Sequence, residues 1–272
     1  MGGIVWLASY PKSGNTWIRA FLGNYLANAD KPVSLARLSL SREFLSAGHS
    51  TIYSKFSSKN VADMSDEELA EIRPQAHRSL ASQRAGRVFV KCHSFLGDIF
   101  GVPAITGDVT AGAIYVVRNP LDVCCSFARH MGSSVDDTIE LMNSEGARLV
   151  GTPEAHGQKF DHAPEYMHSW SENVRSWTEV ESAKICVLQY EDLLLDPAAN
   201  FARVIRFLDM DLDDERLARS ISFSSIEKLR KQESEEGFAE ASPHTDGFFG
   251  QGTAGQWEEV LTNDQVRRLV DN

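Results

Sequence analysis

The segment 10–17 carries the residue types that bind an anion. It reads Tyr-Pro-Lys-Ser-Gly-Asn-Thr-Trp and lies between a short apolar run and a helical pattern. The first N–H groups of a helix have no acceptor within it, and a glycine lets the backbone approach a phosphate closely. We therefore expect a phosphate-binding loop made of Lys12, Ser13, Gly14, Asn15, Thr16 and Trp17. It is not a Walker A loop, because its lysine precedes the glycine, and an ordinary turn with an exposed lysine remains the alternative interpretation.

A second cationic position, Arg118, follows the apolar run 113–117. Asn119 and Pro120 are typical of a helix start, so Ser126 falls on a helix expected to continue to about Arg129. A guanidinium at the end of a strand can bind a phosphate through two hydrogen bonds, and a hydroxyl on the next helix can complete the site. The alternative for Arg118 is a surface ion pair.

Lys91 and His93 stand at the end of a third apolar run, 88–91. Residues two apart on a strand point to the same face, so this cation and this imidazole are expected to project together. Such a pair could stabilise an anion and accept a proton. A lone histidine is more often structural, and that interpretation remains open for His93.

The elements that must position these residues are strands alternating with helices. Short, continuous apolar runs rich in β-branched residues predict strands at 4–9, 88–91, 113–117 and 185–189. We expect helices to begin at Pro120, Pro164 and Pro197, and Thr262 with Gln265 predicts a capping box for a final helix. This alternation predicts an α/β fold, a mostly parallel central sheet flanked by helices, in one domain spanning 1–272. Ligands bind at the carboxyl ends of such strands, where all three motifs lie.

The net charge of the chain limits the classes of ligand that it is expected to bind. The chain has 272 residues, with 27 Lys and Arg against 38 Asp and Glu, a formal net charge of −11. A field of this sign repels nucleic acid and anionic membranes, so neither is expected as a partner. No run approaches the roughly 20 apolar residues of a spanning helix. The spacing of the four cysteines (Cys92, Cys124, Cys125 and Cys186) fits neither zinc nor redox chemistry, so we expect reduced thiols in the cytoplasm.

With these motifs, the chain resembles the cytosolic-type sulfotransferases that use 3′-phosphoadenosine-5′-phosphosulfate (PAPS). Their phosphosulfate loop has the form YPKSGxxW, and their second signature is a strand ending in Arg-Asn-Pro with a serine eight residues after the arginine. The resemblance implies that Arg118 and Ser126 hold the 3′-phosphate and that His93 is the general base. It implies catalytic roles for Lys12, Lys91 and Ser126 as well. Trp17, Tyr190 and Phe223 would surround the adenine.

The largest departure from that family lies near the end of the chain. Where the family has Arg-Lys-Gly-x-x-Gly-x-Trp, this chain has Gly-Gln-Gly-Thr-Ala-Gly-Gln-Trp at 250–257. Backbone N–H groups of Gly250, Gln251 and Gly252 can still contact the 3′-phosphate, but two charge-assisted contacts are lost. We expect weaker donor binding unless a cation elsewhere in the chain substitutes for them.

The resemblance implies an enzyme that moves a sulfuryl group from PAPS to a hydroxyl, or less readily an amine, of a small-molecule or natural-product acceptor. No metal is expected, because lysines would supply the positive charge. Phe95, Phe100, Phe127, Phe248 and Phe249 could line an apolar acceptor pocket. A P-loop kinase or NTPase and a non-catalytic nucleotide-binding protein are the alternatives. Homodimer formation is left open by the sequence.

Overall fold

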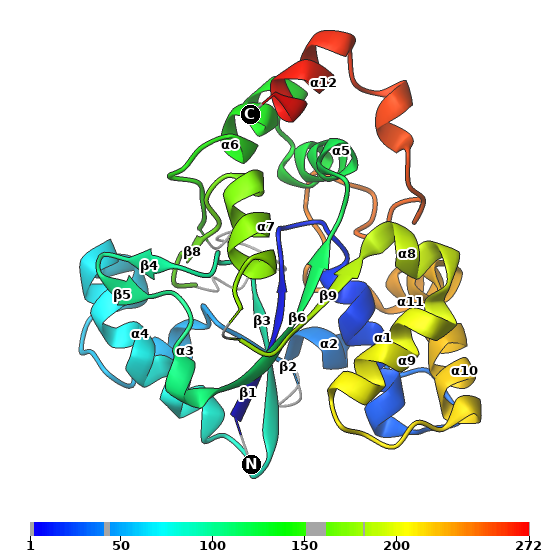
Figure 1. Cartoon of the computed structure of the whole chain (residues 1–272), viewed down its shortest axis with the longest axis horizontal. Coiled ribbons are helices and arrows are strands. Elements are labelled where there is room, and N and C mark those ends of the chain that lie inside the picture. Colours follow the sequence, from blue (N-terminus) through cyan, green and yellow to red (C-terminus); the bar gives the residue numbers. More distant parts are fainter. Residues whose placement is uncertain (1–2, 41–43, 151–161, 182, 272) are drawn as a thin grey trace.

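The computed structural model describes residues 3–40, 44–150, 162–181 and 183–271. Its centre is a five-stranded sheet in the order β2-β3-β1-β6-β9, with every pair parallel (Figure 1). The strands are β1 Gly3–Ser9, β2 Phe44–Ser46, β3 Arg87–Cys92, β6 Thr110–Val117 and β9 Ile185–Gln189. Two antiparallel pairs lie outside it: β4 Asp98–Ile99 with β5 Val102–Pro103, and β7 Arg148–Leu149 with β8 Glu165–Tyr166.

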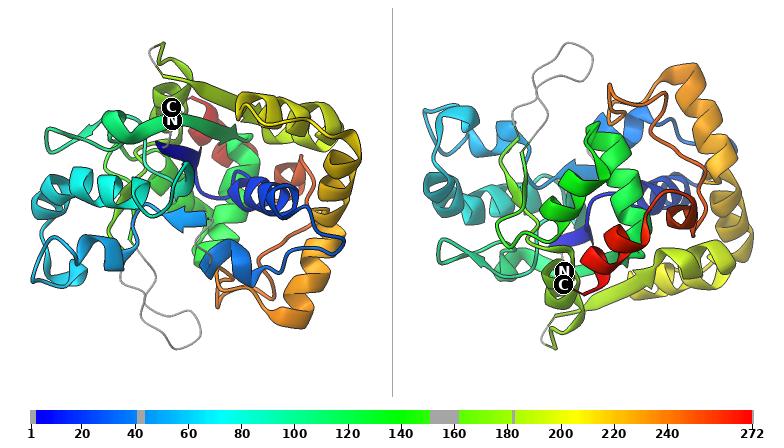
Figure 2. Two further views of the ribbon diagram at one scale, coloured as in Figure 1. Left: turned by 90° about the horizontal axis from the view of Figure 1, so that it is seen from below. Right: turned by 90° about the horizontal axis from the view of Figure 1, so that it is seen from above.

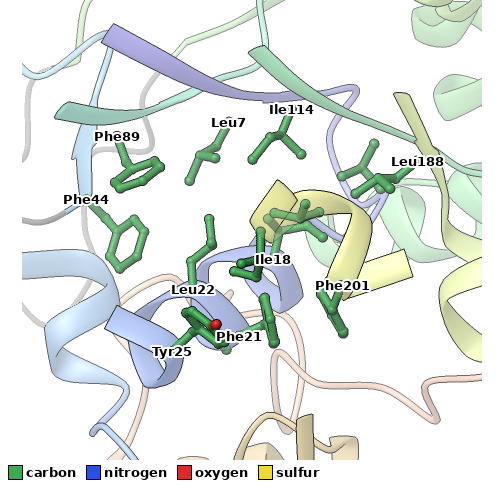
Figure 3. Packing of buried hydrophobic residues seen from close by; sticks show 14 of the residues in the cluster. Leu7, Ile18, Phe21, Leu22, Tyr25, Phe44, Phe89, Ile114, Leu188 and Phe201 are labelled. Carbon is green, nitrogen blue, oxygen red and sulfur yellow. The ribbon is translucent and has the colours of Figure 1, made fainter. Parts of the chain in front are cut away.

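One face of the sheet packs on helices from both halves of the chain. Leu7, Phe89, Ile114 and Leu188 project from four strands toward Phe21 and its neighbours in α1 (Figure 3). Phe21 stacks on Phe201, with ring centroids 3.9 Å apart. The helices on this side are α1 Asn15–Ala27, α2 Ala36–Leu40, α8 Tyr190–Leu195, α9 Pro197–Phe207, α10 Asp214–Phe223 and α11 Ile226–Glu236.

The opposite face buries the alternate residues of the same strands, as a period of two requires. In β1, Ile4, Trp6 and Ala8 face this side, whereas Val5 and Leu7 face the other. The covering elements are α3 Ser50–Tyr53, α4 Asp66–Ala81 and α7 Trp170–Thr178, with the short turns η1 Val61–Asp63 and η2 Gly107–Val109 nearby. Figure 2 shows helices on both sides of the sheet.

A third group of helices lies beyond the carboxyl ends of the strands, at the top of Figure 1. It comprises α5 Pro120–Met131, α6 Val135–Met142 and α12 Asn263–Val270, with η3 Gln256–Glu259 against α5. Phe127, Met142 and Leu269 are buried among them. Segments from the middle and the end of the chain therefore meet directly above the edge where the three motifs emerge.

The predicted strands are confirmed, and 185–189 has the expected bounds. α5 begins at Pro120 and α9 at Pro197 as expected, and Thr262 and Gln265 form the predicted capping box. The prediction of a helix beginning at Pro164 was wrong. Strand β8 follows there, and α7 begins at Trp170, where Ser169 and Glu172 form a capping box.

Asn173 of α7 ties this helix to the sheet. It is fully buried, accepts a hydrogen bond from the Tyr115 hydroxyl at 2.9 Å, and donates to the carbonyls of Met167 at 2.8 Å and His93 at 3.2 Å. An apolar replacement would leave all three partners buried without this hydrogen bond. Each unsatisfied group costs about 1–3 kcal/mol.

We predict that Asn173→Leu lowers the free energy of unfolding by at least about 2 kcal/mol, measured by equilibrium denaturation in urea. Tyr115→Phe removes one of the three contacts and should lose about 1 kcal/mol. Equal stabilities for the two variants would contradict the assigned role of Asn173.

Candidate active site

A cavity of about 530 Å³ opens at the carboxyl edge of the sheet. The loop after β1, the end of β3 and the loop after β6 all reach it, as the topology of a parallel sheet requires. The predicted site residues that line it are Lys12, Gly14, Asn15, Thr16, Trp17, Lys91, His93, Arg118, Ser126, Tyr190, Gly250, Gln251 and Gly252. Ser13 and Phe223 do not line it.

The loop between β1 and α1 has the backbone of an anion cradle. Lys12 and Gly14 have φ values of 66° and 112°, so the chain turns sharply before α1 begins. A Cβ on Gly14 would lie 2.8 Å from the Tyr190 ring, so a side chain does not fit there. The Ser13 hydroxyl is buried and has no hydrogen-bond partner among the described residues. Gly14, Asn15 and Thr16, at the start of α1, line the same cavity, where the first N–H groups of a helix can bind an anion.

Arg19, which the sequence analysis missed, organises the first turn of α1. Its Nε donates to Asn15 Oδ1 at 3.1 Å and its Nη2 donates to Thr16 Oγ1 at 2.8 Å. Asn15 in turn donates to the carbonyl of Leu7 at 2.8 Å, so its side chain has a structural role. Because Thr16 Oγ1 accepts from Arg19, its own hydrogen is left to donate to a ligand.

Glu240 joins two cations of the site and was also missed. Its carboxylate accepts from Arg19 at 2.7 and 2.8 Å and from Lys91 Nζ at 3.0 Å. Burial alone would raise the pKa of Glu240, but the charges and hydrogen bonds of Arg19 and Lys91 hold that pKa well below its usual value. A carboxylate thus fixes Lys91 in an otherwise cationic site. Its place in an irregular stretch far along the chain gave no sequence signal.

Lys12 is largely surrounded by protein. Its ammonium lies 3.8 Å from the centre of the Phe248 ring, and no hydrogen bond joins it to Ser126 in the described part of the chain. Burial lowers the pKa of Lys12 to about 7, and the positive charge of Arg129 adds to this effect. A dianion entering the cavity would oppose both effects and favour the charged lysine.

The backbone fixes the tautomer of His93. Its Nδ1 lies 2.7 Å from the carbonyl oxygen of Ser9, so Nδ1 carries the hydrogen and Nε2 is the basic nitrogen. The His93 N–H donates to Glu165 at 2.5 Å. Burial, reinforced by the charge of Lys91, lowers the pKa of His93 to about 3. The ring is therefore neutral near pH 7 and able to accept a proton.

Arg118 is buried in the site and makes no ion pair with any residue that the structure describes. Its Nη1 donates to the carbonyl of Lys12 and its Nη2 to that of Thr253, each at 3.2 Å. Its Nε is buried and has no partner among the described residues. An unsatisfied charged donor beside a cavity is suited to a ligand anion.

The loop 250–257 is held over the cavity by Asp122. This buried carboxylate accepts from the N–H groups of Gly255 at 2.8 Å and Trp257 at 3.2 Å. Gly252 lies against Ile226, and Gly250 lies against the guanidinium of Arg129. The three expected residues of this loop therefore reach the site, although Gln251 supplies no charge.

Part of the cavity lining is aromatic and apolar. The rings of Trp17 and Tyr190 meet edge to face at 5.7 Å, and Arg118 lies 4.4 Å from the centre of the Tyr190 ring. Leu193, Pro197, Ile221, Ile226 and Leu229 also line the cavity. Phe223, expected here, lies beside Lys228 instead. At the end of α10 it is Ile221 that reaches the cavity.

Two further histidines, His130 and His162, line the cavity. Burial lowers the pKa of each to about 4. His130 could have been found from its place on α5, one turn after Ser126. Of the phenylalanines considered for an acceptor pocket, Phe127, Phe248 and Phe249 line the cavity, whereas Phe95 and Phe100 do not.

Within the described ranges, no three His, Cys, Asp or Glu side chains are grouped so that they could hold a metal ion. No helix among the described residues is both long and apolar enough to span a bilayer.

Comparison with known proteins gives the family. The model of the sulfotransferase domain matches residues 4–271. Sulfotransferase 1B1 of the dog (Canis lupus familiaris) is 26% identical over 269 residues, covering 97% of this chain and 79% of that protein. Sulfotransferase 1B1 of the mouse (Mus musculus) is 29% identical over 161 residues, covering 57% and 50%. Luciferin sulfotransferase of Photinus pyralis is 25% identical over 232 residues, covering 82% and 56%. The matches with the last two span only about half of those proteins.

Solved structures agree in fold. A crystal structure of a mouse sulfotransferase complexed with PAP (3′-phosphoadenosine-5′-phosphate) is similar to this chain, with a TM-score of 0.60 and 18% identity. The match covers 97% of this chain and 81% of the other. Retinol dehydratase, in complex with androsterone and the inactive cofactor PAP, gives a TM-score of 0.65 at 18% identity, covering 98% and 78%. Since the family model spans nearly the whole chain and the expected phosphosulfate-loop residues converge on one cavity, this protein belongs to the sulfotransferase family.

Proposed function

We propose that this chain, acting as a single domain, transfers a sulfuryl group from PAPS to a hydroxyl of a small-molecule acceptor, or less readily to an amine. The convergence of Lys12, Lys91 and Arg118 on a neutral, oriented His93 carries the proposal. The three cations can bind an anionic donor, and His93 can remove the proton of the acceptor.

The residues present fit such a donor. The N–H groups at the start of α1, with Lys12, suit the 5′-phosphosulfate, and the unpaired Nε of Arg118 with Ser126 suits the 3′-phosphate. Trp17 and Tyr190 offer aromatic surface to an adenine. The donor supplies the activated sulfuryl group.

Each of these side chains has a separate role in the proposed in-line displacement. His93 Nε2 accepts the acceptor's proton as the new O–S bond forms. Lys12 offsets the negative charge on the bridging oxygen, which leaves on the 5′-phosphate with the electron pair of the broken S–O bond. Lys91, held by Glu240, offsets charge on the sulfuryl oxygens. Positioning and charge stabilisation dominate, as in phosphoryl transfer.

The acceptor end of the cavity favours a molecule with apolar surface. Phe127, Phe248 and Phe249 line the cavity together with Met131 and Leu149. The luciferin sulfotransferase among the relatives is named for a small-molecule acceptor, which supports the same class here.

Donor-dependent transfer tests the proposal directly. The purified chain is incubated with PAPS and a panel of phenols, aliphatic alcohols, sugars and amines, and sulfated products are detected by mass spectrometry. A donor lacking the sulfate is the control. We expect product with at least one hydroxyl acceptor. Complete inactivity across the panel, together with ATP hydrolysis, would overturn the proposal in favour of an NTPase.

We predict that His93→Ala lowers kcat at least about 100-fold, because general-base catalysis contributes that much or more. Affinity for PAP, measured by calorimetry, should stay within about two-fold. His162→Ala is a matched control, since this imidazole lines the same cavity and has no role in the proposed reaction. Full activity of the His93 variant would refute the assignment of the base.

We predict that PAP binding takes up a proton at pH 8. With a pKa of about 7, Lys12 is mostly neutral in the free protein at that pH, and a bound phosphate favours its charged form. Affinity should therefore fall as the pH rises above 7. Calorimetry in buffers of different ionisation enthalpy measures the uptake. Lys12→Met should abolish it and the surface change Lys184→Met should not; uptake that persists without Lys12 would contradict the prediction.

We predict that Glu240→Gln shifts this pH dependence downward. The carboxylate raises the pKa of Lys12, so its removal should lower the pH above which PAP binding weakens. The variant should also be less stable by about 1–3 kcal/mol, because Arg19 and Lys91 lose a charged partner. Glu68→Gln, on the exposed surface, is the control. An unchanged pH profile would show that Glu240 does not tune Lys12.

A further inference from the structure

The proposed 3′-phosphate subsite is short of positive charge. Arg118 and Ser126 face it, but Gly250 and Gln251 contribute only backbone groups and a neutral amide. A phosphate monoester carries nearly two negative charges at neutral pH. One guanidinium that already donates to two backbone carbonyls is a weak counterpart for that charge.

Arg129 lies where a second cation is needed. It follows Ser126 by three residues on α5, so both side chains lie on the same face of the helix. Arg129, Arg118 and Ser126 all line the cavity.

The glycine at 250 makes room for Arg129. A Cβ built on Gly250 would lie 2.5 Å from Nη2 of Arg129, so a side chain at position 250 would displace this exposed guanidinium from its present place. Gly250 is not among the glycines with positive φ, so its backbone does not require glycine. The space beside Gly250 is occupied by the neighbouring guanidinium of Arg129.

The charge environment of Arg129 also suits an anion. Among the described residues, it makes no hydrogen bond or ion pair with an acidic side chain. Of the charged groups around Lys12, Arg129 lowers the lysine pKa the most. Glu240 offsets part of this effect on Lys12, and a bound polyanion would offset it further.

We propose that Arg129 binds the 3′-phosphate of the donor, in the space left by the absent side chain of Gly250. The inference rests on the proposed function, because it names a further residue for the same donor. It assigns the second cation to α5 rather than to the loop 250–257.

The test compares two nucleotides that differ in the 3′-phosphate. Binding of PAP and of adenosine 5′-phosphate is measured by calorimetry on the intact chain and on Arg129→Gln. We expect the variant to lose about 10- to 100-fold in PAP affinity and to bind adenosine 5′-phosphate within two-fold of the parent. Arg129→Lys should recover part of the loss. Arg175→Gln, on the exposed face of α7, is the matched control and should change neither affinity.

A second variant tests the role of the glycine. Gly250→Ala should weaken PAP binding in the parent, but it should have little further effect in the Arg129→Gln background, because the two positions act on the same contact. Additive losses would show that residue 250 acts independently of Arg129.

The outcomes separate the two proposals. If the parent chain binds PAP no better than adenosine 5′-phosphate, the donor assignment fails and this inference with it. If the parent prefers PAP and Arg129→Gln keeps that preference, only the role of Arg129 is overturned. Equal losses for both nucleotides would likewise overturn it, by assigning Arg129 a general effect on the cavity.

Discussion

Cations gathered at one edge of a parallel sheet repel each other, and the other charged groups of this site must compensate for that repulsion. The strand ends bring Lys12, Lys91 and Arg118 to one cavity in a chain whose net charge is −11. Burial lowers the pKa of Lys12 the most, and the positive charges of Arg129, Lys91 and Arg118 lower it further. Part of the compensation is internal, since Glu240 neutralises Lys91 and Arg19. The remainder is left for a ligand, which makes the free site electrostatically poised for a polyanion.

The sequence allowed the sheet and its motifs to be predicted because their signals are local. The run 185–189 is short, apolar and β-branched, and the helix starts at Pro120 and Pro197 follow directly from the chemistry of proline and its preceding cap. Topology then placed Lys12, His93 and Arg118 together, because parallel strands end at one edge. At Pro164 the same rule failed, because the capping box at Ser169 sets the helix start instead.

The rest could not be predicted because it depends on contacts between distant segments. Arg19 and Glu240 are separated by 221 positions, and neither lies in a recognisable motif. His162 reaches the cavity from a stretch with no regular pattern. Phe223 and Ile221 are two residues apart at the end of α10 and lie on nearly opposite sides of that helix, so the packing of the helix decides which one lines the cavity. Such choices are made by packing, which a single sequence does not encode locally.

The hydrogen bonds from Gly255 and Trp257 to Asp122 have a consequence for biosynthesis. The loop after β1 lines the cavity, but the hydrogen bonds that hold the loop 250–257 over it come from residues about 240 positions later in the chain. During translation, residues up to Trp257 must therefore leave the ribosome before this cover can form. A nascent chain can fold its sheet early but gains no stabilisation from the nucleotide until that fastening forms.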